Sequence, residues 1–263
     1  MIIEIDKRYN LVTNWDDLGY KKCADLDEYI KSLPEWIKMM LMDEEPPEGS
    51  PVDPLKMFEV YAKCLEILSD IPYDVLSHVA FMDLLPTFEF IKTLVISMIG
   101  DVYVDLHEIE GFVHEGDYYA MPLSDTDITG AVVPCAEITA LEFCEASDLH
   151  QAGYRYAGNI VSILCRKTGE KYDEKICKER GKWDIKMPVV FEVLHKLTAV
   201  HEYSKKLYQN IYKQGKGKSS AMNNFGWMGK ILWLGGVENK EKIEQMNVYE
   251  FMRLLSFKLA ENE

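Results

Sequence analysis

The sequence predicts a mainly α-helical protein with one small antiparallel β-sheet. Apolar residues recur every three or four positions over most of the chain, which is the spacing of a helix with one buried face. Only residues 101–121 alternate apolar with polar positions and are rich in β-branched and aromatic residues, as strands are. Of the 263 residues, 48% are hydrophobic and 28% charged, so the chain can bury a core.

The N-terminal part is expected to begin with a short strand within residues 1–12 and to continue as helices. The first helix is predicted to start at an Asn14 cap and to run to Leu33. Residues 43–55 hold four prolines and one glycine, so they predict a loop. The further helices expected before residue 100 cover 36–42, 55–69, 73–85 and 87–99.

The hairpin is expected at Phe112–Met121, turning at Glu115–Asp117. Helices follow to the end of the chain. The last of them has Asn247 as its cap and a continuous apolar stripe. The predicted C-terminal helices cover 134–147, 154–167, 173–179, 188–213, 221–234 and 247–259.

Charge divides the chain into two parts. Residues 1–150 hold 31 acidic and 9 basic side chains, net −22, and residues 151–263 hold 13 and 20, net +7. Such polarity is typical of a chain that stacks head to tail or docks on a partner of opposite charge, the alternative being a solvated acidic surface. We expect an acidic N-terminal region, 1–130, and a helical, mildly basic C-terminal region, 131–263, packed as one compact unit.

Several classes of protein do not fit this composition. No apolar run approaches the roughly 20 residues of a membrane span, and the first residues lack the basic and apolar regions of a signal peptide. None of the six cysteines has C-x-x-C spacing, so we expect reduced, buried thiols. We therefore expect a protein that is neither secreted nor bound to a membrane.

No motif in the chain identifies an enzyme. Residues 215–219 resemble the end of a phosphate-binding loop, but Tyr212 stands where that motif needs a glycine. A mobile surface loop or a basic contact loop through Lys213, Lys216 and Lys218 fits better, and weak contact with DNA is one use for it. We expect no catalytic residue and no cofactor.

A metal site is the one chemical alternative. Asp105, His107 and His114 could share one face of the small sheet and offer ligands to a hard or borderline metal. The competing interpretation is a polar outer face. A metal-dependent enzyme therefore stays open as a third hypothesis for function.

Methionines and tryptophans gather in two places and are candidate interface residues. Large aromatic and methionine side chains adapt to partner surfaces, although they also fill cores. The candidates are Trp36, Met39, Met40 and Met42 before the proline-rich loop, and Phe225, Trp227, Met228 and Trp233 near the C-terminus.

Several short segments stand in order along most of the chain: 15–18, 112–118 with the helix at 137–143, 163–166, 172–174, Arg180, 187–188, 227–235 and 247–249. Together these segments resemble a family of tailed-bacteriophage structural and tail-assembly proteins. The family includes proteins of crAss-like phages and other phages of Bacteroides-type gut bacteria, and it is distantly similar to baseplate-hub proteins and tail-assembly chaperones. Gly19 stands where the family pattern has threonine, and the linker after Met42 is long and rich in proline.

The resemblance implies a virion component and supplies no catalytic residues. The expected function is a structural protein of the phage tail, neck or baseplate region, assembled in the host cytoplasm and present in the virion. Its partners would be other phage proteins or further copies of itself. The alternative is a soluble tail-assembly chaperone that is absent from the mature particle and shields a hydrophobic client with its methionines.

Overall fold

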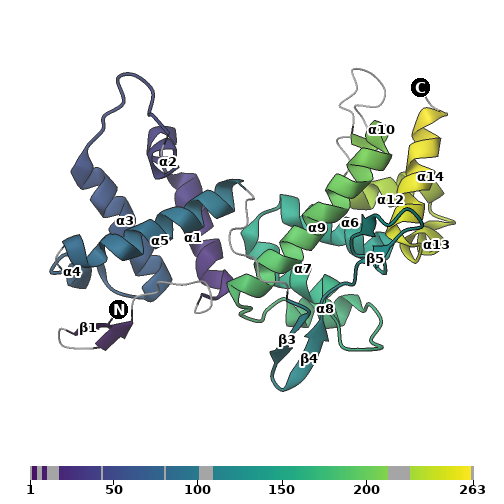
Figure 1. Cartoon of the computed structure of the whole chain (residues 1–263), viewed down its shortest axis with the longest axis horizontal. Helices are drawn as coiled ribbons and strands as arrows, with labels where there is room; N and C mark the ends of the chain where they lie inside the picture. The colour runs from purple at the N-terminus through teal and green to yellow at the C-terminus, as the bar shows by residue number, and fades with distance from the viewer. Residues whose placement is uncertain are drawn as a thin grey trace. The chain divides into compact units, whose positions relative to one another are not determined.

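The computed structural model describes residues 2–4, 8–10, 18–42, 44–79, 81–100, 109–212 and 226–261. It confirms the predicted class, because helices dominate and the strands in these ranges are all antiparallel (Figure 1). The strands form three separate two-stranded ladders, however, where one sheet was expected. The chain divides into two compact units, unit 1 with residues 1–106 and 184–188, and unit 2 with residues 107–183 and 189–263.

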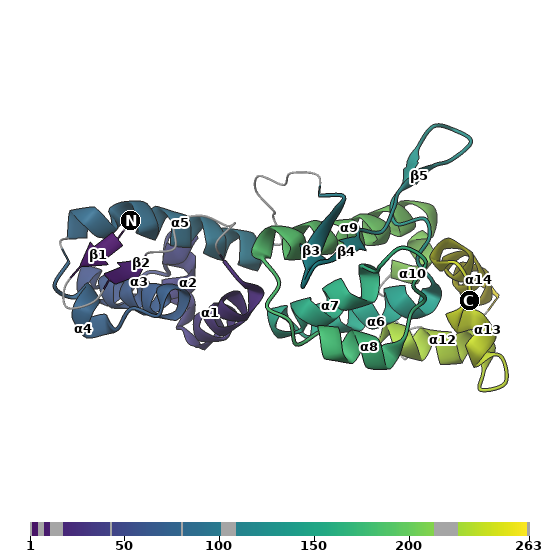
Figure 2. The same ribbon diagram turned by 90° about the horizontal axis from the view of Figure 1, so that it is seen from below.

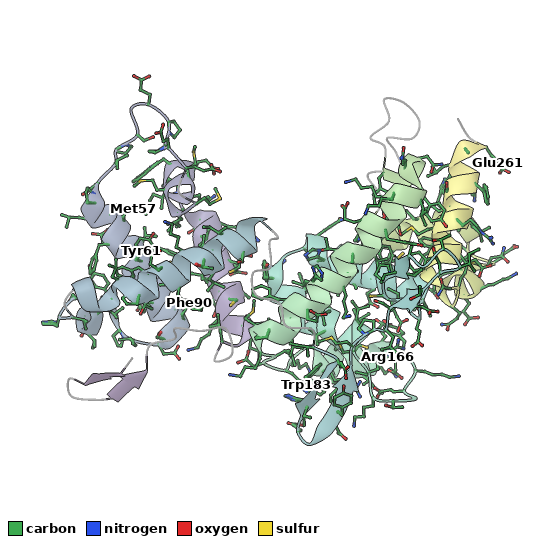
Figure 3. The ribbon with its side chains drawn as sticks, in the orientation of Figure 1. Met57, Tyr61, Phe90, Arg166, Trp183 and Glu261 are labelled. Atoms are coloured by element: carbon green, nitrogen blue, oxygen red, sulfur yellow. The ribbon has the colours of Figure 1, made fainter. Side chains whose placement is uncertain are left out.

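Unit 1 is a small helical unit with one two-stranded ladder. Helix α3, which carries Tyr61 (Figure 3), packs against α1, α4 and α5. The Tyr61 ring stacks on Phe88 of α5 at 4.9 Å. Asp53 caps α3, since its carboxylate accepts the Leu55 N–H at 2.9 Å. The elements are β1 (Ile2–Glu4), β2 (Arg8–Asn10), α1 (Tyr20–Ser32), α2 (Glu35–Leu41), α3 (Pro54–Ser69), α4 (Tyr73–Leu76) and α5 (Phe81–Gly100).

The first helix starts later than predicted. Residues 11–17, including the expected Asn14 cap, lie outside the described ranges, and Leu18 and Gly19 are not helical. Instead, the Met187 N–H donates to the Leu18 carbonyl at 2.8 Å and the Tyr20 N–H donates to the Ile185 carbonyl at 2.9 Å. This pairing holds Gly19 extended opposite Lys186 and makes 184–188 part of unit 1.

The predicted break at Pro86 is wrong. Helix α5 continues through this proline. The expected helix over 73–85 is divided, because α4 forms a single turn and residues 81–85 belong to α5. Pro86 lies near the start of α5, where its ring removes one intrahelical hydrogen bond. The helix has a long buried face that offsets this loss, with Leu84, Phe88, Ile91, Leu94 and Val95 all in the core.

Unit 2 consists of helices with two hairpins. Helix α6 packs against α7, α12, α13 and α14, and α7 packs against α8 (Figure 2). The elements are β3 (Gly111–His114), β4 (Asp117–Ala120), β5 (Asp125–Thr126), β6 (Val132–Val133), α6 (Ala140–Gln151), a 3₁₀ turn (Tyr154–Tyr156), α7 (Ala157–Leu164), α8 (Glu174–Arg180), α9 (Met187–Leu207), α10 (Gln209–Tyr212), α12 (Trp227–Gly235), α13 (Lys240–Glu244) and α14 (Val248–Ala260).

Side-chain caps fix the starts of α6 and α14 in unit 2. The Asn247 side chain accepts the Tyr249 N–H at 2.9 Å, which confirms the predicted cap of α14. Helix α6 begins at Ala140 rather than at Pro134, because residues 134–137 form a turn after β6. Its cap is Thr139, whose hydroxyl accepts the Glu142 N–H while the Glu142 carboxylate accepts the Thr139 N–H.

The β3–β4 hairpin turns where the sequence predicted. Glu115 and Gly116 have φ angles of 52° and 88°, the left-handed pair that a two-residue hairpin turn requires and that favours glycine. The buried Tyr119 ring lies edge-on to Trp183, and the Arg180 guanidinium lies over Tyr119 at 4.9 Å.

These contacts explain where the chain divides. By charge the hairpin belongs to the acidic N-terminal part, yet its side chains pack on elements of unit 2. The boundary therefore lies near residue 106, whereas the change in composition suggested residue 130. Composition reports the surface charge of a segment, while the boundary depends on which core buries its apolar face.

Candidate protein-interaction site

The second hairpin, residues 123–133, projects from unit 2 and is called the arm below (Figure 2). Asp125 pairs with Val133, and Thr126 pairs with Val132. The arm exposes apolar side chains along its length: Leu123 is 60% exposed, Val132 is 64% exposed and Ile128 is fully exposed at the tip. An isolated exposed residue is ordinary, but three on one projecting hairpin indicate a contact surface.

The base of the arm is fixed in the core of unit 2. Met121 and Cys135, on either side of the arm, are buried. The Cys165 thiol donates to the Met121 sulfur at 3.5 Å, and the Ala136 N–H donates to the Leu123 carbonyl at 2.8 Å. The arm therefore leaves the body from a packed base.

The tip of the arm is organised by Asp127. Its carboxylate accepts hydrogen bonds from the Thr129 hydroxyl at 2.6 Å, the Thr129 N–H at 2.8 Å and the Ala131 N–H at 3.0 Å. These hydrogen bonds, first among them that of the Thr129 hydroxyl, lower the pKa of Asp127. Gly130 has a φ of 83°, a left-handed conformation that glycine adopts without strain.

The hydrogen bonds to Asp127 fix the turn that carries Ile128, whose side chain is fully exposed to solvent. Burying an isoleucine side chain is worth about 1.5–3 kcal/mol relative to leaving it exposed. A preformed turn also loses little conformational entropy when a partner covers it. The arm is thus suited to inserting an apolar tip into another protein surface.

The arm was not among the predicted elements. Its signal in the sequence is Asp127-Ile128-Thr129-Gly130 before Val132-Val133, which is a turn sequence followed by β-branched residues. The predicted elements end with the hairpin at Met121 and resume with the helix at Pro134, so they do not include this turn.

The first predicted interface cluster lies on α2 in unit 1. Trp36, Met39, Met40 and Met42 are each half-buried, while Ile37 and Leu41 face the core. The cluster therefore keeps part of its methionine surface exposed. Whether it meets a partner stays a prediction.

The second predicted cluster divides between core and surface. Trp227 is buried, with Phe143 edge-on to its ring at 5.0 Å and the Lys230 ammonium 3.7 Å from the ring centre. Met228 and Trp233 are half-buried. Trp227 thus serves the core of its own unit, and the other two remain interface candidates.

The remaining candidates are Phe225, the lysines of the expected basic loop and the three candidate metal ligands. Phe225, Lys213, Lys216 and Lys218 lie outside the described ranges, as do Asp105 and His107. His114 is described, and its ring stacks on Trp183 at 4.1 Å. Within the described residues, no three His, Cys, Asp or Glu side chains group together as metal ligands.

His201 forms a buried polar cluster in unit 2. Its Nε2 lies 3.0 Å from the Ser147 hydroxyl, and its Nδ1 lies 3.4 Å from the Tyr212 hydroxyl. Burial lowers the pKa of His201 to about 4, and the positive charges of His150 and Lys230 add to this effect. Tyr212 and Trp227, which flank segment 213–225, both border His201, and their ring centres are 5.9 Å apart.

The cysteines of both units are buried free thiols, as predicted. Burial raises the pKa of Cys64 and of Cys135 to about 12, and that of Cys177 to about 11. These thiols therefore stay protonated at neutral pH and behave as small apolar side chains.

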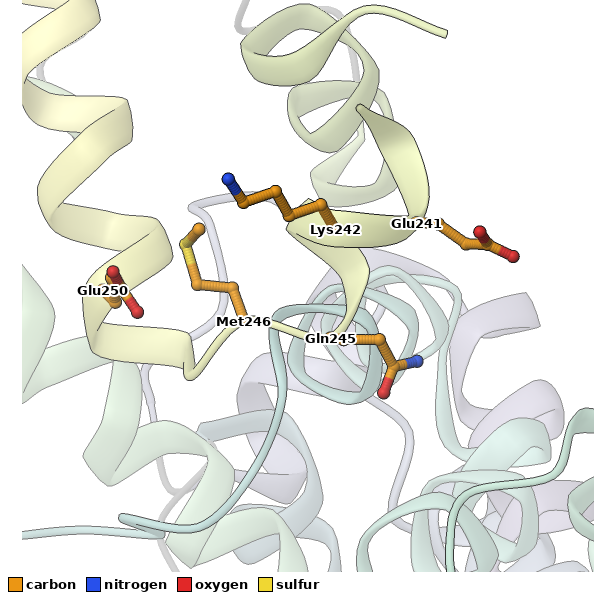
Figure 4. A pocket seen from close by; sticks show the side chains of 5 residues that line it. All are labelled: Glu241, Lys242, Gln245, Met246 and Glu250. Carbon is orange, nitrogen blue, oxygen red and sulfur yellow. The ribbon is translucent and has the colours of Figure 1, made fainter. Parts of the chain in front are cut away.

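An open groove of about 760 Å³ lies between α13 and α14 (Figure 4). Met246 and Lys242 lie between the two helices, and Glu250 projects from the first turn of α14 (Figure 4). Glu241 and Gln245 complete the lining. The groove is a charged surface feature with one apolar residue in it.

Comparison with known proteins assigns the chain to no group. No protein-family model, curated protein or solved structure matches it. In the described part of the chain, no helix combines the length and the apolar character needed to cross a membrane.

Proposed function

We propose that this protein acts through contacts with other proteins, as a structural component of the tail, neck or baseplate region of a tailed phage. The observation that carries the proposal is the arm, which exposes Ile128 on a turn held by three hydrogen bonds to Asp127. A preformed apolar tip is useful to a protein that has to fit into an assembly. The assignment to a phage is supported by the short segments that resemble phage tail proteins.

Mass spectrometry of gradient-purified particles of the phage that encodes the chain tests this function. The copy number is measured against the portal protein of the same particles. We expect a fixed stoichiometric presence, such as one copy per subunit of a ring. Absence from the particles would overturn the proposal.

A soluble tail-assembly chaperone is the second candidate, and α2 favours it. Met39, Met40 and Met42 are half-exposed and adjacent, and flexible methionines suit a surface that accepts varied apolar segments. The same experiment separates the two functions. A chaperone would be missing from purified particles and would co-purify with tail proteins from infected cells.

A further inference from the structure

Two sulfur atoms meet at the base of the arm. A backbone bridge joins Ala120 to Arg166, so the residues next to them, Met121 and Cys165, lie opposite each other. The Cys165 Sγ atom is 3.5 Å from the Met121 Sδ atom. Two sulfur ligands of one metal ion lie about 3.8–4 Å apart, because each is about 2.3 Å from the ion. A small adjustment of the side chains therefore lets both sulfurs bind the same ion.

Cys135 supplies a third sulfur. The Ala136 N–H donates to the Leu123 carbonyl at 2.8 Å, which places Cys135 next to the segment that carries Met121. Burial, and after it the negative charge of a Cys135 thiolate, raises the pKa of Cys165, so the two thiols are close enough to interact. All three sulfur-bearing side chains are buried. They form one cluster that links both ends of the arm to Cys165, at the C-terminal end of α7.

The types of ligand in this cluster select the metal. Thiolate and thioether sulfurs are soft ligands that favour Cu(I), whereas carboxylates and carbonyls favour hard ions. Structural zinc sites have four ligands, and in the described part of the chain no third His, Cys, Asp or Glu side chain joins the two cysteines. Glu192, whose charge acts on both thiols, is paired with Lys196 at 3.4 Å. Two thiolates and one thioether therefore suit Cu(I).

We propose that Cys135, Cys165 and Met121 bind one Cu(I) ion at the base of the arm. The ion replaces the two thiol protons, which pass to solvent, while the thioether binds through a lone pair and loses no proton. The positive charges of Lys196 and Arg166 favour the thiolate form of Cys165. The bound ion ties the two ends of the arm together, and it does so whatever partner the arm contacts.

Competition with bathocuproine disulfonate, a coloured chelator of Cu(I), tests the site in the purified full chain under reducing, oxygen-free conditions. We expect the wild-type chain to retain one Cu(I) ion. Cys135→Ala and Cys165→Ala should each weaken Cu(I) binding by about a hundredfold or more. Cys144→Ala is the matched control, since Cys144 is a buried thiol of the same unit near Asp148 and Lys230, and should leave the affinity unaltered.

Met121→Leu tests the thioether without relying on the cysteine variants. It removes the sulfur and nearly keeps the volume of the side chain, so circular dichroism of the metal-free variant should show an unchanged fold. Cu(I) binding should weaken by about tenfold or more, whereas Met252→Leu, at another buried methionine of unit 2, should have no effect. X-ray absorption at the copper edge should show three sulfur neighbours in the wild type and two in Met121→Leu.

A wild-type chain that yields all its Cu(I) to the chelator would overturn the proposal. So would a loss with Cys144→Ala equal to that with Cys165→Ala, or a copper spectrum with nitrogen or oxygen ligands in place of the three sulfurs. These measurements use the purified chain alone. Their failure would leave the proposed function standing, because that function is tested by the composition of the particles.

Discussion

The ammonium group of Lys230 lies 3.7 Å from the centre of the Trp227 ring, and both side chains are buried. Burial lowers the pKa of Lys230, since desolvation penalises its charged form. The electron-rich face of the indole compensates part of that cost. The pair links α12 to the core of unit 2, where Phe143 and His201 also border the indole ring.

Replacing Trp227 should therefore cost far more stability than replacing Trp233. We expect Trp227→Ala to lower the free energy of unfolding of unit 2 by about 3–5 kcal/mol, because it leaves a large cavity. Trp233→Ala, at a half-buried position, is the matched control and should cost less than about 2 kcal/mol. Urea unfolding followed by circular dichroism measures both. Equal losses would contradict the division of this cluster into core and surface.

His201 should make unit 2 sensitive to acid. Its pKa is about 4 in the folded protein and about 6.5 when unfolded, so the unfolded state binds the proton more readily between these values. Stability should be constant above pH 6.5 and fall by up to about 3 kcal/mol as the pH drops to 4. His201→Gln should remove this contribution to the slope. If the stability of the variant depended on pH between 6.5 and 4 as steeply as that of the wild type, the acid sensitivity would not come from His201.

Glu142 should be important for the stability of α6. Its carboxylate is fully buried, lies 2.5 Å from the Arg166 guanidinium and also completes the cap with Thr139. Glu142→Ala leaves the arginine without its partner, and we expect a loss of about 3–5 kcal/mol. Thr139→Ala removes the two hydrogen bonds of the hydroxyl, accepted from the Glu142 N–H and donated to the Glu142 carboxylate, and should cost about 1 kcal/mol. Denaturant unfolding of the two variants compares them, and a larger loss for Thr139→Ala would be inconsistent with this account.

Asp127 should control the order of the arm and contribute little to the rest of unit 2, which it contacts through the Tyr203 side chain of α9. Asp127→Ala removes three hydrogen bonds at the tip. Hydrogen exchange of the amides at 129–131 should become at least tenfold faster, while the midpoint of global unfolding stays nearly unchanged. Asp125→Ala is the control, since its carboxylate accepts only the adjacent Thr126 N–H among the described contacts. Equal protection of the tip in both variants would show that Asp127 does not organise the turn.

The parts of the fold that were predicted correctly depend on local chemistry. Glu115-Gly116 specifies a hairpin turn through backbone conformation, and Asn247 specifies a helix start through one side-chain hydrogen bond. The parts that were missed depend on distant segments. Helix α1 begins at Tyr20 because residues 185–187 pair with its start, and no pattern within residues 14–20 reveals that pairing.

Prediction of the candidate site was limited in the same way, because the burial of a residue depends on distant segments of the chain. The aromatic clusters were evident from composition, but composition did not distinguish the buried Trp227 from the half-buried Trp233. The turn sequence of the arm was visible in Asp127–Gly130. Its exposure became known only with the structure, because it depends on the buried base formed by Met121 and Cys135.

The short distance between Tyr212 and Trp227 offers a route to engineering the chain. Their ring centres lie 5.9 Å apart, so a flexible Gly-Ser linker can join the two flanks in place of residues 213–225. The entropy of closing a loop grows only slowly with its length, so an affinity tag or a fluorescent domain can also be inserted there. Such a label would leave the arm unaltered, because residues 213–225 and the arm are separate segments of the chain.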